Sequence, residues 1–262
     1  IDKIHFSGAI NPGMSGGPVV GHDGRVVGVN VATAGNEIGF LVPVEPLIAL
    51  HKTLSGKTSG PDNGVVERQL LKNEQNVVDN LLKKDWESVP FGPFMVPGRI
   101  HAAFKCWGNA AYTQKDPFKY FQSTCSSQDE IFLDDDFSTG TMTLRSDYLI
   151  GNPDLDLSRF YAFYQQEYAT PTREDQSGED HVTNYDCTTR FVEQAGHLWK
   201  TSFCARRYKK YPGLYDMMLV MALLDRGREG MILSLEAAGV SKDSAQALSR
   251  RFLNEIRLKP ES

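Results

Sequence analysis

Short apolar runs separated by glycine and asparagine fill the first forty residues of the chain. Runs of this kind, bounded by turn-forming residues, predict short strands. We expect four of them, at residues 4–7, 18–20, 26–31 and 39–42. A short helix is expected over 43–52, where Pro46 suits the first turn.

A polar, glycine-rich segment at 55–61 predicts a linker between two domains, residues 1–54 and residues 62–262. Beyond it, apolar positions recur at helical spacing over 65–86 and again after Ser241, which suits a helix N-cap. Between these helices the pattern predicts a loop at 90–98 and mainly strands. The expected strands are 99–105, 130–133, 141–144, 160–164, 191–195, 198–208, 217–224 and 231–237. The second domain is therefore expected to be α+β, an antiparallel sheet with packed helices.

The composition is that of a globular protein, with 40% hydrophobic and 23% charged residues. The net charge of -5, without a dominant basic block, argues against a nucleic-acid partner. The longest apolar run, 217–224, is too short for a membrane span. Acidic clusters at 134–136 and 152–156 lack the spacing of a calcium-binding loop, so we expect no metal and no other cofactor.

Four cysteines lie in the second domain, and none forms a Cys-x-x-Cys pair, which argues against a zinc site. Their spacing suggests the disulfides Cys106–Cys125 and Cys187–Cys204. Three connectivities are open to four cysteines, and four reduced, buried thiols are the alternative. Each bridge would close a short loop and contribute about 3 kcal/mol to stability.

Candidate chemistry is concentrated near the start, in Ile10-Asn11-Pro12-Gly13-Met14-Ser15-Gly16-Gly17-Pro18. A serine in a glycine-rich turn can present its hydroxyl beside backbone N–H groups, which stabilise the oxyanion of an attacked carbonyl. The nucleophile elbow of an α/β-hydrolase needs a long helix after its serine. Here a strand, a turn and another strand follow, which excludes that elbow.

This segment resembles the nucleophile segment of trypsin-like serine proteases, and most closely that of the high-temperature-requirement (Deg-type) branch. The branch has a pattern of approximately Ala-Ile-Asn-Pro-Gly-Asn-Ser-Gly-Gly-Pro. The likeness continues through 24–30 and 38–43 and covers residues 6 to about 50. It implies that residues 1–54 are the C-terminal part of a protease barrel. The expected fold class is then mostly β, a partial trypsin-like β-barrel followed by the α+β domain.

The resemblance also implies roles for individual residues. Ser15 becomes the nucleophile, and the N–H groups of Gly13 and Ser15 become the oxyanion hole. The implied substrate-binding residues are Ile10, Ile38 and Gly39 at the pocket, and Asn30, Val31 and Ala32 along a strand that pairs with the substrate. Two isoleucines would favour small aliphatic side chains in the substrate. Met14 replaces the usual Asn or Asp, so we expect the loop to lose a fixing side-chain hydrogen bond.

A serine nucleophile needs a base and a group that orients the base. In trypsin-like proteases the histidine and the aspartate precede the serine, and the residues before Ser15 offer only Asp2 and His5, which lie too close to it in sequence. We therefore expect this chain to be part of a longer protein and to cleave no peptide bond alone. With its upstream part, we expect a serine endopeptidase that acts on polypeptides.

Two alternatives to this enzyme remain open at this stage. The first is a catalytically inactive, protease-like scaffold. The second is a secreted binding protein whose second domain recognises a partner. The resemblance and the disulfides together imply a periplasmic or secreted location. Deg-type relatives often form trimers, so a homo-oligomer is among the assemblies that the resemblance implies.

Overall fold

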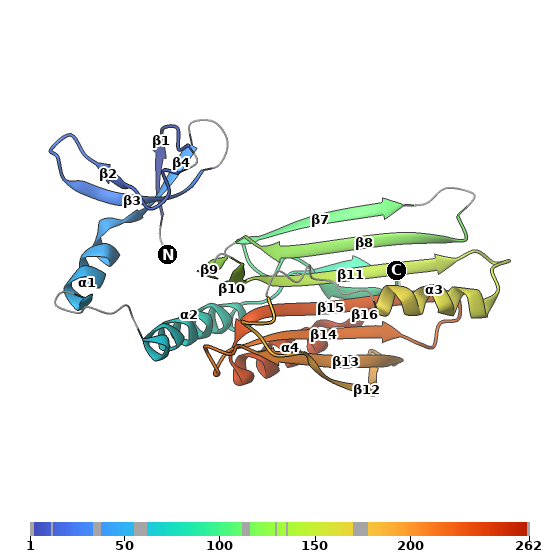
Figure 1. Ribbon diagram of the computed structural model, residues 1–262. Coiled ribbons are helices and arrows are strands. Elements are labelled where there is room, and N and C mark those ends of the chain that lie inside the picture. Colours follow the sequence, from blue (N-terminus) through green and yellow to red (C-terminus); the bar gives the residue numbers. More distant parts are fainter. Residues whose placement is uncertain are drawn as a thin grey trace. The chain divides into compact units, whose positions relative to one another are not determined.

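The computed structural model of the chain describes residues 3–11, 13–33, 38–54, 62–111, 116–128, 130–134, 136–169 and 178–260 (Figure 1). The chain divides into two compact units, residues 1–61 and residues 62–262. The division falls at the end of the expected linker, and residues 55–61 themselves lie outside the described residues. Antiparallel sheets dominate, and the protein is a β-rich α+β protein, as expected.

The first unit is an antiparallel sheet followed by a helix. Its strands are β1 (Ile4–Ser7), β2 (Pro18–Val20), β3 (Val26–Thr33) and β4 (Ile38–Pro43), in the order β1-β4-β3-β2, and α1 (Val44–Leu54) follows. The alternation in the sequence predicted these elements to within two residues at each end. Among the described residues of this unit, Leu41 is the only large apolar side chain that is buried, at 2% exposed.

The second unit is built on a seven-stranded antiparallel sheet with the order β12-β13-β14-β15-β11-β8-β7, so that β12 and β7 are its edges. Its strands are β7 (Phe104–Ala111), β8 (Phe118–Ser127), β11 (Met142–Gly151), β12 (Asp186–Gln194), β13 (His197–Arg207), β14 (Tyr215–Leu223) and β15 (Glu229–Val240). The shorter strands are β5 (Ser88–Phe91), β6 (Phe94–Pro97) and β16 (Arg257–Leu258) in one sheet, and β9 (Ile131–Asp134) and β10 (Phe137–Thr139) in another.

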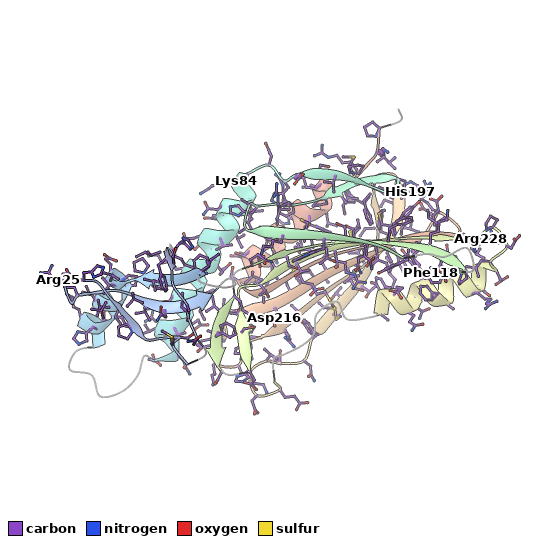
Figure 2. The ribbon with its side chains drawn as sticks, turned by 90° about the horizontal axis from the view of Figure 1, so that it is seen from above. Arg25, Lys84, Phe118, His197, Asp216 and Arg228 are labelled. Atoms are coloured by element: carbon purple, nitrogen blue, oxygen red, sulfur yellow. A yellow bond between two sulfur atoms is a disulfide. The ribbon has the colours of Figure 1, made fainter. Side chains whose placement is uncertain are left out.

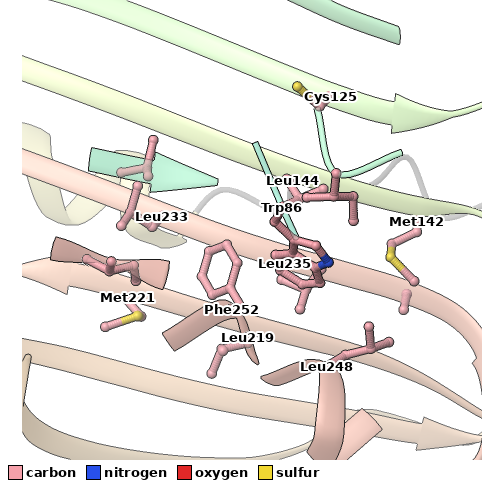
Figure 3. Close-up of a cluster of buried hydrophobic side chains, with 14 of the residues drawn as sticks. Trp86, Cys125, Met142, Leu144, Leu219, Met221, Leu233, Leu235, Leu248 and Phe252 are labelled. Atoms are coloured by element: carbon pink, nitrogen blue, oxygen red, sulfur yellow. The ribbon is translucent and has the colours of Figure 1, made fainter. Parts of the chain in front are cut away.

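The two faces of the large sheet contact different helices, because successive side chains of a strand point to opposite faces. Leu235 of β15 packs with Val78 and Phe252 in the largest buried cluster (Figure 3). These two residues belong to α2 (Asn63–Lys83) and α4 (Lys242–Glu255). Ile232 of β15 lies on the other face, in a cluster with Phe160 of α3 (Leu157–Ala169). The unit therefore has α2 and α4 on one face of the sheet and α3 on the other.

The expected helix after Ser241 is present as α4. The Ser241 hydroxyl accepts a hydrogen bond from the backbone N–H of Ser244 at 3.2 Å, which satisfies one of the free donors of the first turn. The side chains of the expected apolar stripe are all buried: Ala245, Leu248, Phe252 and Ile256. Burial of this stripe against the sheet, rather than helix propensity, fixes α4.

Residues 160–164 were expected to form a strand, and this prediction is wrong. They lie inside α3, where Phe160 and Tyr164 are four residues apart, on one helical face, and buried against the sheet. Asp156 begins the helix by accepting the Ser158 N–H at 2.9 Å. This hydrogen bonding to Ser158 holds the pKa of Asp156 below its ordinary value. The aromatic run misled the prediction because it also suits a strand.

Residues 90–98 were expected to form a loop, and most of them form the hairpin of β5 and β6 instead. Gly92 supplies the turn with a φ of +55°, a conformation that side chains disfavour. Phe94 and Val96 point into the main core, at 0% and 1% exposed. Burial of these side chains therefore outweighs the prolines that suggested a loop.

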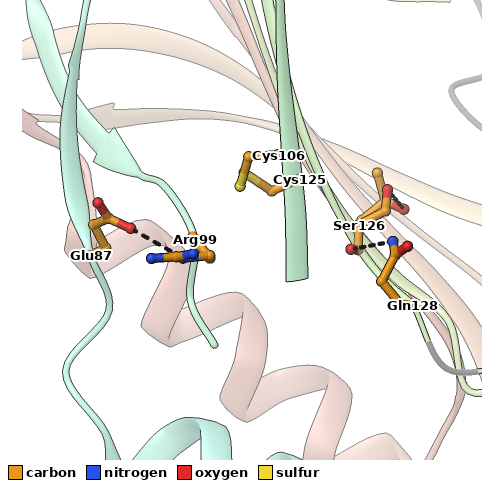
Figure 4. Close-up of a disulfide and its surroundings, with 7 residues drawn as sticks. Glu87, Arg99, Cys106, Cys125, Ser126 and Gln128 are labelled. Atoms are coloured by element: carbon orange, nitrogen blue, oxygen red, sulfur yellow. Dashed lines mark hydrogen bonds and ion pairs between the residues drawn. A yellow bond between two sulfur atoms is a disulfide. The ribbon is translucent and has the colours of Figure 1, made fainter. Parts of the chain in front are cut away.

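Each edge strand of the large sheet is linked by a disulfide to its inner neighbour. Cys106 of β7 pairs with Cys125 of β8 (Figure 4). Cys187 of β12 pairs with Cys204 of β13. These are the pairs that the spacing suggested. In both bridges the cysteine of the edge strand is exposed and its partner is buried.

Asp216 of β14 organises a buried polar network at one end of the large sheet (Figure 2). Arg206 Nη2 lies 2.8 Å from Asp216 Oδ2, with both side chains almost fully buried. The Tyr208 hydroxyl donates to Asp216 Oδ1 at 2.6 Å, and the Gly239 N–H donates to the same oxygen at 3.2 Å. The network ties the ends of neighbouring strands together, because a buried charge requires such partners.

Candidate active site

Two consecutive turns shape the loop that carries Ser15. The Met14 N–H donates to the Asn11 carbonyl at 3.1 Å, and the Gly17 N–H donates to the Met14 carbonyl at 3.1 Å. Gly13 and Gly16 have φ values of +91° and +81°, in the left-handed region that favours glycine. These glycines therefore let the backbone reverse direction on both sides of Ser15.

The base of this loop is bonded to β3. The Gly16 N–H donates to the Asn30 carbonyl at 2.8 Å, and the Asn30 N–H donates to the Gly17 carbonyl at 3.0 Å. Asn30 is buried at 4% exposed. Its backbone groups are therefore occupied by the loop, and Asn30 positions the loop that carries Ser15.

Ser15 and the flanking backbone face solvent. Both Gly13 and Ser15 are exposed. Among the hydrogen bonds between described residues, none uses the Gly13 N–H, the Ser15 N–H or the Ser15 hydroxyl. The N–H groups of Met14 and Gly16, by contrast, are both engaged. Within the described residues, the loop thus leaves two N–H groups without a partner beside the exposed Ser15 hydroxyl, and an oxyanion hole would use such a pair of donors.

The hydrogen bonding of the Met14 side chain differs from the expectation. We expected its replacement of Asn or Asp to leave the loop without a side-chain hydrogen bond. The structure has the Asn11 N–H donating to Met14 Sδ at 3.3 Å. A thioether sulfur is a weak acceptor, so this bond fixes the loop less strongly than an amide or carboxylate oxygen would.

The residues expected to bind substrate are only partly brought together. A Cβ atom placed on Gly39 would lie 2.3 Å from the Phe6 ring and 2.9 Å from Ile10 Cδ1, so Phe6 and Ile10 occupy the space above Gly39. Ile38, at 39% exposed, points to the opposite face of β4 because side chains alternate along a strand. Phe6 was not singled out from the sequence, since only the pairing of β1 with β4 brings it here.

The expected substrate-pairing strand has an irregular backbone. The register of β3 against β4 shifts between Asn30 and Ala32, so that Val31 forms a β-bulge. The Val31 side chain is 39% exposed. A bulge re-aims the backbone locally, and the part of β3 beyond Asn30 is the part that a substrate strand could reach.

The described part of the chain shows no base for Ser15. His5 lies on β1 opposite Phe40, with the ring centroids 5.7 Å apart, and His22 lies in an exposed turn. Among the described residues no hydrogen bond joins Ser15 to a histidine or an aspartate. The exposed hydroxyl is therefore not activated by the residues that the structure describes.

Two polar clusters in the second unit bond mainly within themselves, although the buried His181 Nδ1 has no hydrogen-bond partner among the described residues. The Tyr120 hydroxyl donates to Asp147 Oδ1 at 2.7 Å, and Arg145 Nε donates to Asp147 Oδ2 at 2.8 Å. Burial, together with the hydrogen bond to Asp147, raises the pKa of Tyr120 to about 12. His181 Nε2 lies 2.8 Å from Asp136 Oδ1, and its ring stacks on Phe137. These clusters hold strands and loops together, and sequence reasoning singled out neither of them.

Within the described ranges, no group of three or more His, Cys, Asp or Glu side chains could hold a metal ion. In the same ranges, every helix is too short or too polar to span a membrane.

Comparison with known proteins relates part of the chain to one class. No family model matches the chain. It is 36% identical over 63 residues to HhoA of Synechocystis, 33% identical over 99 residues to "Protease Do-like 1, chloroplastic" of Arabidopsis thaliana, and 36% identical over 89 residues to "Serine protease Do-like HtrA" of Bacillus subtilis. These matches cover 23%, 35% and 31% of this chain.

The same matches span only 16%, 22% and 20% of the three relatives. Among solved structures, LpqN of Mycobacterium tuberculosis overlaps 70% of this chain and 97% of its own at 10% identity, but its TM-score of 0.32 carries no argument about fold or function. A part of this chain is thus related to Deg-type serine proteases, at partial coverage of both proteins.

Proposed function

We propose that residues 1–54 contribute the nucleophile segment of a serine endopeptidase, with Ser15 as the nucleophile. One observation carries the proposal. Ser15 stands exposed on a loop whose N–H groups at Met14 and Gly16 are hydrogen-bonded, while those of Gly13 and Ser15 have no partner among the described residues. The partial relationship to Deg-type serine proteases supports the same assignment.

In this mechanism Ser15 Oγ attacks the carbonyl carbon of a peptide bond, and its proton passes to a base. The oxygen of the carbonyl becomes an oxyanion, which accepts hydrogen bonds from the N–H groups of Gly13 and Ser15. Collapse expels the amine, which takes the proton from the base, and leaves an acyl-enzyme that water hydrolyses. No described residue is placed to act as the base or its orienting group. We assign residues 62–262 the role of an accessory domain.

A fluorophosphonate probe tests this proposal, because it reacts covalently with activated serines. We expect the protein from the complete reading frame to be labelled, and Ser15→Ala to abolish the labelling. Ser7→Ala is the matched control, since Ser7 is an exposed serine on β1 of the same unit and should leave the labelling unchanged. Labelling that survives in Ser15→Ala would assign the nucleophile to another residue.

Gly13→Ala tests the oxyanion hole separately from the nucleophile. Open space surrounds the position of a new Cβ on Gly13, but a side chain disfavours the φ of +91°. Reorientation of the Gly13 N–H should lower peptidase kcat about 100-fold or more, the usual cost of losing one oxyanion donor. An unchanged kcat would mean that this N–H does not contact the transition state.

An inactive protease-like scaffold is the second candidate, and one observation favours it. No described histidine or aspartate is bonded to Ser15. If the protein from the complete reading frame resists the probe while remaining folded, the scaffold function replaces the peptidase. We further propose a polypeptide as the ligand in both cases. A periplasmic or secreted location is consistent with the two disulfides.

A further inference from the structure

The strand β7 leaves one edge of the large sheet open in the second unit. Among the described residues, β7 pairs only with β8. Every residue from Lys105 to Ala110 is exposed, including Trp107 at 55%. A strand with an open edge presents unpaired backbone N–H and C=O groups to solvent.

The position of the disulfide identifies which backbone groups point outward. Cys106 lies directly opposite Cys125 with the Cα atoms 4.0 Å apart, the short spacing of a pair that is not hydrogen-bonded. Lys105 and Trp107 therefore bond to β8, and the N–H and C=O groups of Cys106 and Gly108 face away from it. Among the described residues these outward groups have no partner.

A groove of about 470 Å³ lies next to Cys106, over the face of β7 and β8 that carries the disulfide. Val89 and Gly98 form one side of it, and Phe104 and the disulfide form the other. Figure 4 shows Glu87 and Arg99 across the groove from the disulfide, joined by a long ion pair of 3.9 Å. The lining is mixed, so a side chain that enters here would contact Val89, Phe104 and the disulfide beside polar groups such as Ser123 and Arg99.

Charges around the groove favour an acidic partner. Arg99 and Lys105 are positive and Glu87 is negative, and all three are exposed. Two copies of β7 paired with each other would bring two such net positive rims together. A separate polypeptide with acidic residues beside its apolar ones would instead neutralise the excess charge.

We propose that the open edge of β7 binds an extended segment of a partner polypeptide as an added antiparallel strand. The partner's backbone bonds to Cys106 and Gly108, one apolar side chain enters the groove, and flanking acidic residues contact Arg99 and Lys105. Main-chain bonding supplies affinity, and the groove supplies selectivity for alternate side chains. The site does not depend on Ser15, so it can be tested in Ser15→Ala protein.

The test uses fluorescence, because Trp107 is exposed while Trp86 and Trp199 are buried at 5% and 0%. The probe is a capped peptide of three valines alternating with threonines, with two aspartates at each end. We expect saturable binding that changes the Trp107 emission. In the antiparallel arrangement, the residues with side chains in the groove also turn their N–H groups to β7. Methylating the valine nitrogens should therefore weaken binding about tenfold or more, and methylating the threonine nitrogens should not.

Two variants at Gly108 provide the matched pair. Gly108→Pro removes the outward N–H of residue 108 and no hydrogen bond to β8. Gly108→Ala keeps that N–H, and its Cβ would come no closer than 3.8 Å to the Gln122 carbonyl oxygen. We expect loss of binding in the first and retention in the second. Far-ultraviolet circular dichroism verifies that both remain folded.

Three results would overturn the proposal. The first is equal binding of both methylated peptides, or a reversed order of their affinities. The second is unchanged binding by a folded Gly108→Pro. The third is a dimer of the unliganded protein in sedimentation that Gly108→Pro dissociates, because β7 would then pair with a second copy.

Discussion

The two units differ in how far their apolar side chains are buried. In the first unit, the strands and α1 expose apolar side chains, including Val20 at 54% and Leu50 at 49%. In the second unit, three clusters bury large side chains on both faces of one sheet. Leu248 and Trp199, for example, are 0% exposed.

The difference shows that an alternating apolar sequence pattern can form a strand whether or not the apolar side chains are buried. Alternating apolar residues specify strands in both units, yet only the second unit brings helices over both faces of its sheet. A sheet of about sixty residues without a covering layer buries too little apolar area to offset its conformational entropy. We therefore expect the first unit to be much less stable by itself than the second.

The largest expected effect is on folding of the separated units. A fragment of residues 62–262 should unfold cooperatively at nearly the same temperature as the complete chain, since its three clusters lie within it. A fragment of residues 1–61 should show no cooperative transition, because Leu41 is its only buried large apolar side chain among the described residues. Circular dichroism during heating measures both. A sharp transition in the short fragment would contradict the comparison.

The core of the second unit can be tested with one kind of substitution at two sites. Phe252→Ala, at a side chain 2% exposed, should lower the free energy of unfolding by about 3–5 kcal/mol. Phe132→Ala, at a side chain 75% exposed, should change it by less than about 0.5 kcal/mol. Urea denaturation followed by fluorescence compares them. Similar losses at both sites would show that burial does not determine the stability of this unit.

The edges of the large sheet should depend on their disulfides. Replacing both Cys187 and Cys204 with alanine removes a cross-link between residues 17 apart, which should cost about 3 kcal/mol through the entropy of the unfolded chain. Hydrogen exchange should accelerate first in β12. Denaturation under non-reducing conditions gives the cost, and protection of β12 equal to that in the parent protein would mean that pairing with β13 suffices.

The last expected effect is a loss of stability in alkali, and it belongs to the second unit, which contains all the tyrosines. Burial raises the pKa of Tyr120 and of Tyr148 to about 12, from 10.0 in the unfolded chain. Between these values the unfolded state loses protons that the folded state keeps, so stability should be constant below about pH 10 and fall toward pH 12. Urea midpoints across this range measure the fall, which should be shallower in Tyr120→Phe.

The sequence specified the first unit well because its strands are short and its turns contain glycine. It also predicted the glycine-rich turn around Ser15, since Gly13 and Gly16 flank this residue and both adopt positive φ. It did not reveal Phe6 above Gly39, because that contact depends on which strands pair.

In the second unit, local preference competed with burial. The aromatic run in α3 was mistaken for a strand, although Asp156 was available as a signal for the start of a helix. The strand β8 was missed altogether, because its many polar residues hide the alternation. In the structure β8 pairs with β7, with Cys125 directly opposite Cys106.

The two covalent links also determine what a proteolytic cut would do. Each bridge closes a single hairpin, joining residues 19 and 17 positions apart, rather than connecting distant parts of the chain. A nick between Cys106 and Cys125, or between Cys187 and Cys204, would leave both pieces attached. A protein nicked there would migrate intact on a non-reducing gel and separate into two pieces after reduction.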